Sequence, residues 1–114
     1  MPNGEWARLR PHETAALRRG AWYRVVRVTP REAVVDVNGL PIILPRTSVQ
    51  IVPVKPERWA VVSRPPNALR MPDSWGSRYG VCPNCRERAR LEPRAAGMRC
   101  PKCNGYFDIG WDDV

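Results

Sequence analysis

The sequence predicts a mainly β chain built from two small modules, and three observations lead to this prediction. Residues 21–54 contain short runs of β-branched and aromatic residues separated by turn residues, a pattern typical of a small β-sheet protein. Four cysteines stand in two close pairs near the C-terminus. The 114 residues include 13 prolines, which disfavour long helices. A chain of this length forms one ordinary domain or two very small ones.

The first module is expected within residues 1–62, as a short N-terminal helix followed by a sheet. Residues 11–19 are predicted to be helical because Pro11 suits the first helical position, and Arg18 and Arg19 oppose the helix dipole in the last turn. A helix this short needs to dock on the rest of the module. Strands are expected over residues 22–28, 32–37, 40–44 and 49–52, and residues 59–62 offer a fifth.

Asn38 and Gly39 give the strongest hairpin signal in the chain, because a type I′ turn requires positive φ at both positions. Four or five short strands, one tight hairpin and a short turn before the last strand resemble the small SH3-like β-barrels, the class of ribosomal, Tudor and KOW-type modules. The resemblance covers residues 20–62 at most. It implies a small barrel but no particular activity.

Residues 63–80 are expected to form a Pro-rich linker between the modules, because they hold three prolines and two glycines and show no strand or helix period. Trp6 and Trp75 lie outside the clear strands, so they are the aromatic residues best suited to contacts with a partner. The other aromatic side chains of interest are expected in the two cores: Trp22, Trp59, Tyr106, Phe107 and Trp111.

The four cysteines form two C-P-x-C pairs with fourteen residues between them. Structural zinc sites hold Zn²⁺ with four tetrahedral ligands, and a C-x-x-C turn directs two sulfur atoms toward one metal. The chain has no export signal, which favours metal binding in a reducing cytoplasm over disulfides. The sequence therefore predicts one structural Zn²⁺ bound by Cys82, Cys85, Cys100 and Cys103.

These paired turns resemble the zinc-ribbon class over residues 81–111. The resemblance implies a C-terminal zinc ribbon, expected over residues 81–114, in which residues 88–92 and 98–100 form a hairpin and residues 106–111 add a third strand. The residue after each cysteine pair often needs a left-handed backbone, which Asn104 tolerates well and Arg86 less well.

Iron is the alternative metal, because rubredoxins also have two C-P-x-C turns and resemble this site locally. Rubredoxins usually have glycine after each pair, where this chain has Arg86 and Asn104, and a longer spacer between the pairs. A catalytic zinc is not expected, because four cysteines leave no open position for water.

The formal net charge of the chain is +8, and all its basic residues except Lys55 and Lys102 are arginines. Four thiolates and one Zn²⁺ would contribute −2 and leave +6. A basic surface attracts nucleic acid, and arginine suits phosphate contacts and stacking on bases. A GC-rich genome would also enrich arginine, so this alternative stays open.

Two arginine clusters are the candidate nucleic-acid contacts. The first surrounds the end of the predicted helix and the strand after it: Arg18, Arg19, Arg24 and Arg27. The second follows the predicted ribbon hairpin: Arg86, Arg88, Arg90, Arg94 and Arg99. Basic residues on such a hairpin would contact phosphates, and the alternative for both clusters is a solvated protein surface.

The sequence indicates no enzyme. His12 is the only histidine and is expected at an exposed helix start, and no Gly-rich phosphate loop, HExxH or paired-carboxylate motif is present. No apolar run approaches the roughly 20 residues that span a bilayer, and the N-terminus lacks the apolar core of a signal peptide. A cytoplasmic protein without a membrane or a small-molecule substrate is expected.

The function that these features favour is non-catalytic binding to nucleic acid or to a nucleoprotein machine such as the ribosome or RNA polymerase. Zinc ribbons and SH3-like barrels both recur in those machines, which is an analogy at the level of fold. A protein–protein adaptor, or a structural subunit of a larger complex, is the main alternative. A rubredoxin-like electron carrier is the third.

Overall fold

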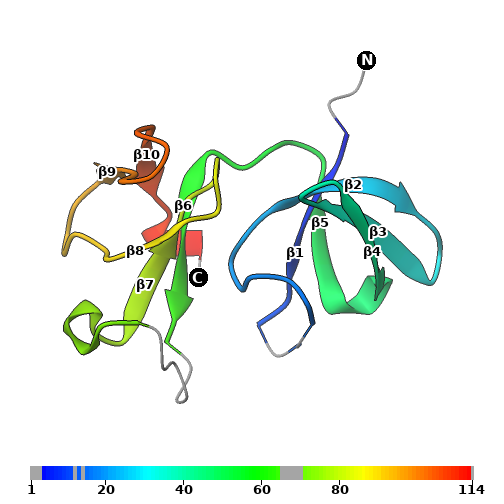
Figure 1. Ribbon diagram of the computed structural model, residues 1–114, viewed down its shortest axis with the longest axis horizontal. Helices are drawn as coiled ribbons and strands as arrows, with labels where there is room; N and C mark the ends of the chain where they lie inside the picture. Colours follow the sequence, from blue (N-terminus) through cyan, green and yellow to red (C-terminus); the bar gives the residue numbers. More distant parts are fainter. Residues whose placement is uncertain (1–3, 12, 14, 65–70, 114) are drawn as a thin grey trace. The chain divides into compact units, whose positions relative to one another are not determined.

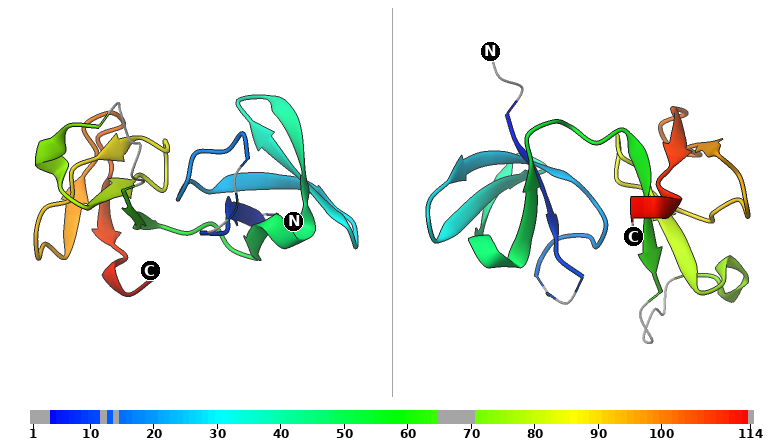
Figure 2. Two further views of the ribbon diagram at one scale, coloured as in Figure 1. Left: turned by 90° about the horizontal axis from the view of Figure 1, so that it is seen from below. Right: turned by 180° about the vertical axis from the view of Figure 1, so that it is seen from behind.

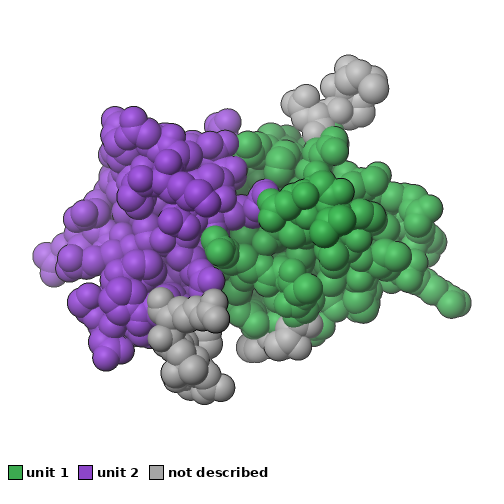
Figure 3. Space-filling model, in the orientation of Figure 1, with its two compact units in different colours: residues 1–56 green, residues 57–114 purple. Residues whose placement is uncertain are grey.

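The computed structural model describes residues 4–11, 13, 15–64 and 71–113, and divides the chain into two compact units, Met1–Pro56 and Glu57–Val114 (Figure 3). The predicted mainly β class is confirmed, because each unit is built around one five-stranded sheet (Figure 1). The predicted exposed position of His12 lies outside the described residues.

The sheet of the first unit has the strand order β4-β3-β2-β1-β5, with antiparallel neighbours throughout. It curls into a half-barrel, and its first and last strands in that order do not pair (Figure 2). A single 3₁₀ turn, η1 (Arg46–Ser48), precedes the last strand. The strands are β1 (Trp6–Leu9), β2 (Tyr23–Val28), β3 (Glu32–Val37), β4 (Leu40–Pro45) and β5 (Val49–Val52).

The predicted hairpin is confirmed at the turn between β3 and β4. Asn38 and Gly39 have φ values of 53° and 88°, the positive values that a type I′ turn requires. The amide of Gly39 donates a 2.8 Å hydrogen bond to Oδ1 of Asp36. Ala33 and Val35 of β3 are both fully buried, but Val34 between them is buried as well, so the predicted alternation holds only in part.

The predicted N-terminal helix is wrong. The described residues of 11–19 form bends and a turn, which side-chain hydrogen bonds stabilise. The Arg19 guanidinium donates to the carbonyl oxygens of Pro11 (2.6 Å) and Glu13 (2.8 Å). Ser48 Oγ donates to the Glu13 carboxylate at 2.8 Å. These bonds replace the few that a helix of two turns would make, and such a helix is marginal on its own.

The strand predicted at residues 59–62 exists as β6 (Arg58–Ser63), but it belongs to the sheet of the second unit. The fifth strand of the first sheet is β1, which pairs with both β2 and β5. Its four residues are too few to show a clear period in the sequence. Ala7 and Leu9 are nevertheless buried on one face.

The sheet of the second unit has the order β8-β7-β6-β10-β9, in which only β6 and β10 are parallel (Figure 1). Residues 63–80, expected as a linker, contain a 3₁₀ turn and the start of β7. The elements after β6 are η2 (Asp73–Trp75), β7 (Arg78–Val81), β8 (Arg88–Ala89), β9 (Gly97–Arg99), β10 (Tyr106–Ile109) and η3 (Trp111–Asp113).

The predicted hairpin between residues 88–92 and 98–100 is wrong. β8 pairs with β7 and β9 pairs with β10, so β8 and β9 lie at opposite edges of the sheet. Each cysteine pair therefore belongs to a hairpin of its own. Within the ranges that the structure describes, no helix has the length and apolar character needed to cross a membrane.

Candidate metal centre

The four cysteines come from two hairpin turns of the second sheet. Cys82 and Cys85 lie between β7 and β8, and Cys100 and Cys103 lie between β9 and β10. All four thiols are free. The first cysteine of each pair is buried and the second is half-buried.

The sulfur geometry fits one tetrahedral metal ion. Sγ of Cys82 lies 3.7 Å from that of Cys103, and Sγ of Cys85 lies 3.6 Å from that of Cys100. All four sulfur atoms lie within 4.8 Å of one another. Tetrahedral bonds of about 2.3 Å place neighbouring sulfurs about 3.8 Å apart, whereas a disulfide requires about 2.05 Å. The cluster is therefore suited to a metal.

The two turns repeat the same three backbone hydrogen bonds. First, the amide of the first cysteine of the pair donates to the carbonyl oxygen five residues later. Second, the amide of the residue that follows the pair donates to the carbonyl oxygen of the first cysteine. Third, the amide two residues after the first cysteine donates to the sulfur atom of that cysteine. The donors are Cys82, Arg86 and Asn84 in one turn (2.9, 3.1 and 3.4 Å) and Cys100, Asn104 and Lys102 in the other (2.8, 2.9 and 3.4 Å).

The residue after each pair has a left-handed backbone, as predicted: φ is 66° at Arg86 and 65° at Asn104. This conformation is required because each residue's amide must turn back toward the carbonyl of the first cysteine. Asparagine adopts it readily and arginine does so at a cost of roughly 1–2 kcal/mol.

We expect Arg86→Gly to stabilise the metal-bound protein by about 0.5–1 kcal/mol, because relief of the left-handed strain exceeds the entropy that glycine adds to the unfolded chain. Urea unfolding of the metal-loaded protein would measure this change. Arg88→Gly, in the extended strand β8, is the matched control and should destabilise the protein. Equal loss of stability in both variants would contradict the prediction.

The cysteines differ in their proton affinity when no metal is bound. Burial raises the pKa of Cys82 to about 12 and also raises the pKa of Cys85. Hydrogen bonds from the side chain of Asn84 and from the amide of Gly105 lower the pKa of Cys103 to about 6. Because metals bind thiolates, metal binding must release protons from Cys82 and Cys85, whose pKa values are raised.

The site has the closed form of a structural centre. Four sulfur ligands complete a tetrahedron and leave no position for a reacting water. Cys82 and Cys100 also belong to the hydrophobic core of the second unit, where they pack with Trp59, Met98 and Ile109. The candidate metal therefore lies at the edge of that core.

The first arginine cluster is only partly available for binding. Arg18 and Arg19 are half-buried in the β1–β2 connection, and Arg19 is engaged with main-chain carbonyls. Arg24 and Arg27 are exposed on β2. The register of β2 against β3 shifts between Val25 and Arg27, as it does at a β-bulge. A bulge adds one residue to the strand, so Arg24 and Arg27, three positions apart, can point to the same face of the sheet.

The second cluster does not share one hairpin. Arg88 on β8 and Arg99 on β9 lie on the two edge strands of the sheet, and these strands do not pair with each other. Arg99 donates a 2.7 Å hydrogen bond to the carbonyl of Asn104. Arg90 and Arg94 are exposed in the connection between β8 and β9. The premise that these arginines share one hairpin is therefore wrong.

A pocket of about 480 Å³ in the second unit brings together two tryptophans and two arginines, Trp75, Arg78, Arg94 and Trp111. Trp75 and Arg94 were both predicted as contact residues. Trp111 was expected in the core, and it packs against the core while also lining the pocket. Arg78 was missed, although an arginine three residues after an unassigned tryptophan was a usable signal.

No family model matches the sequence, and no curated protein and no solved structure matches the chain.

Proposed function

We propose that this is a non-catalytic zinc protein that binds nucleic acid, alone or within a nucleoprotein machine such as the ribosome or RNA polymerase. One observation carries the proposal. Five of the nine predicted arginines have no hydrogen bond or ion pair from their side chains among the described residues: Arg24, Arg27, Arg88, Arg90 and Arg94. Guanidinium groups without internal acceptors are free to bind phosphate oxygens.

The distribution of charge favours the first unit as the main electrostatic surface. Residues 1–56 include nine basic and four acidic residues, a net +5, whereas residues 57–114 carry +3. Four thiolates and one Zn²⁺ would lower the second value to +1. Arg24 and Arg27 stand on the exposed side of β2, next to the exposed side chain of Val26.

The folds support the same class of function. The order β5-β1-β2-β3-β4 with a 3₁₀ turn before the last strand is the arrangement that we expect of an SH3-like barrel. The two C-P-x-C turns that bring four sulfur atoms together are a feature shared with zinc ribbons, although the hairpin predicted between the turns is absent. Both folds occur in nucleoprotein machines, and this support is by analogy.

We expect the double variant Arg24→Ala/Arg27→Ala to weaken nucleic-acid binding and to reduce its salt dependence. Each phosphate contact contributes about −0.9 to the slope of log K against log[salt] for duplex DNA and about −0.7 for single strands. Loss of two contacts should therefore reduce the magnitude of the slope by about 1.4–1.8. Fluorescence anisotropy with labelled RNA and DNA over a range of salt concentrations measures both quantities.

Arg31→Ala/Arg46→Ala is the matched control, because it removes the same charge from exposed positions of the same unit that were not predicted as contacts. It should change the slope less than the first pair does. If the two double variants give the same slope, Arg24 and Arg27 make no specific phosphate contacts. If the wild-type protein binds neither RNA nor DNA, the proposed function is wrong.

A protein–protein adaptor is the second candidate, and exposed apolar side chains on the first unit favour it. Val26, Leu40 and Ile43 are 56%, 66% and 60% exposed. Capture of partners from native lysate, with and without nuclease and high salt, separates the two functions. A single protein that stays bound through both treatments would favour the adaptor, whereas ribosomal or polymerase components that leave would favour nucleic acid.

A rubredoxin-like electron carrier is the third candidate, and the identity of the metal decides it. The four-sulfur site accepts iron as well as zinc, because both metals suit tetrahedral thiolate ligands. Ferric thiolate is red and zinc thiolate is colourless. A colourless protein with one zinc per chain by elemental analysis would exclude electron transfer at this site.

A further inference from the structure

The pocket of the second unit is lined by residues from four separate segments of the chain. Trp75 comes from η2, Arg78 from the start of β7, Arg94 from the β8–β9 connection and Trp111 from η3. Its volume of about 480 Å³ lies within the range of pockets that bind small ligands. These four residues come from parts of the chain up to 36 positions apart, so only the folded unit brings them together.

Two tryptophans line the pocket, and one of them, Trp111, also packs against the core of the second unit. Trp111 is fixed in orientation, because its Nε1 donates a 2.7 Å hydrogen bond to the carbonyl of Ala95. Trp75 is half-buried, so part of its ring remains accessible. A flat aromatic ligand gains the most from such walls, and stacking of a nucleic-acid base on an aromatic side chain contributes about 1–3 kcal/mol.

Two guanidinium groups make the pocket positive. The guanidinium carbon of Arg78 lies 5.7 Å from the centre of the Trp111 ring. Arg94 is exposed and has no side-chain partner among the described residues. None of the described residues that line the pocket is acidic, and the Ser77 hydroxyl adds a donor and an acceptor. The ligand should therefore combine an aromatic ring with an anionic group.

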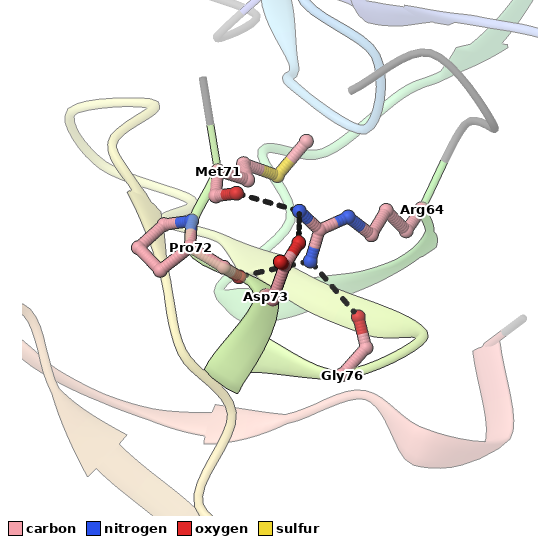
Figure 4. Close-up of polar contacts among 5 residues, drawn as sticks. All are labelled: Arg64, Met71, Pro72, Asp73 and Gly76. Carbon is pink, nitrogen blue, oxygen red and sulfur yellow. Dashed lines mark hydrogen bonds and ion pairs between the residues drawn. The ribbon is translucent and has the colours of Figure 1, made fainter. Parts of the chain in front are cut away.

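Arg64, which does not line the pocket, binds the main chain on both sides of the turn η2 (Figure 4). Its guanidinium donates to the carbonyl oxygens of Met71, Pro72 and Gly76, and it pairs with Asp73 at 3.4 Å. These acceptors lie before, within and after η2, the turn that contains Trp75. The half-buried side chain of Arg64 therefore fastens this turn to the end of β6. The main chain that carries Trp75 is thus held in place before any ligand arrives.

We infer that this pocket binds one unpaired nucleotide of a single-stranded nucleic acid, with the base against Trp75 and Trp111 and a phosphate on Arg94 and Arg78. The inference rests on the proposed function and assigns it a specific site. An unpaired base is required, because the bases of a duplex are stacked on each other and cannot enter a pocket of this size. The indole faces suit any base, so little sequence preference is expected.

The test uses the metal-loaded, isotope-labelled full chain with a short oligouridylate and a short oligothymidylate as probes. The indole N–H signals of Trp75 and Trp111 should shift on binding. The signal of Trp59 should not shift, because that side chain is fully buried and its Nε1 donates to the carbonyl of Met98. Whichever strand, RNA or DNA, produces these shifts is the source of the nucleotide.

Variants then assign the contacts. Trp75→Ala should weaken binding about 5- to 150-fold, the equivalent of the stacking energy, and Trp75→Phe should retain most of the affinity. Arg94→Asn should weaken binding about tenfold, because asparagine keeps the left-handed backbone of this position, where φ is 62°. Arg31→Asn is its matched control, with the same loss of charge at an exposed position outside the pocket and outside both predicted arginine clusters.

The outcomes separate this inference from the proposed function. If the wild-type chain binds nucleic acid and Trp75→Ala and Arg94→Asn bind as tightly as Arg31→Asn, the pocket assignment is overturned while the proposed function stands. If the wild type binds no nucleic acid, both are wrong. A protein partner that is lost with Trp75→Ala, in the absence of any binding to the oligonucleotides, would also overturn the inference.

Discussion

Removal of the metal with a chelator is expected to unfold residues 57–114 and to leave residues 1–56 folded. Structural zinc contributes roughly 10–16 kcal/mol in zinc-finger peptides, which exceeds or equals the whole stability of most domains. In the second unit the edge strands β8 and β9 have only two and three residues, and each is joined to its neighbour through a cysteine turn. Without the metal, few interactions would keep β8 and β9 paired with their neighbouring strands.

The core of the second unit shares its centre with the metal site, which strengthens this expectation. Cys82 and Cys100 are 0% and 1% exposed and pack with Trp59, Met98 and Ile109. The bound metal would cross-link the two hairpins that carry the cysteines. Its loss would remove this cross-link and leave only free thiols at the edge of the core. Metal loss and unfolding should therefore be one event.

Two-dimensional NMR during titration with a chelator measures the effect on both units at once. Signals of β6 to β10 should collapse, signals of β1 to β5 should persist, and added zinc should restore the first set. Cys100→Ser should reproduce the collapse without a chelator. Loss of both sets together would contradict two independently folding units, and survival of both would contradict a structural metal.

Local patterns in the sequence were sufficient to place the hairpin of the first unit and the metal ligands. The strand at residues 32–37 and the turn at Asn38 and Gly39 follow from alternation and from the φ angles that the turn requires. The backbone at Arg86 and Asn104 follows from the spacing within each cysteine pair. In each case the physical cause lies within a few residues of its effect.

Pairings between distant segments could not be predicted in this way. β1 pairs with β5, which lies more than forty residues later, and β6 pairs in parallel with β10 across a similar interval. No turn specifies either register, so the packing of the whole unit decides it. The arginines of residues 86–99 illustrate the consequence, because a spacer of hairpin length leads from one edge of the sheet to the other.

The nucleotide pocket depends on the same kind of distant pairing. The sequence singled out Trp75 and Arg94 separately, yet gave no reason to place them together. Trp111 follows β10, and the parallel pairing of β10 with β6 places η3 beside the strand that leads to Trp75. A site assembled from four short segments is visible only once the sheet order is known.

Trp59→Ala is expected to destabilise the second unit by about 3–5 kcal/mol, the cost typical of removing a large buried aromatic side chain. Trp59 lies in the central strand β6 and is 0% exposed. Its Nε1 donates a 3.0 Å hydrogen bond to the carbonyl of Met98, so the substitution would also leave a buried acceptor without its partner. A Cβ atom at Gly80 would lie 3.0 Å from the ring, which shows how closely the ring contacts strand β7.

Urea unfolding of the metal-loaded protein, followed separately by signals from each unit, measures this cost. Trp22→Ala is the matched control, because it removes a buried indole from the first unit and should destabilise that unit alone. Trp59→Phe should lose less stability than Trp59→Ala, since it keeps a ring in the core but not the hydrogen bond. A cost below about 1 kcal/mol would mean that the metal alone maintains the second unit. A cost of the expected size, together with weaker metal binding, would mean that the core and the four sulfurs fold as one cooperative structure.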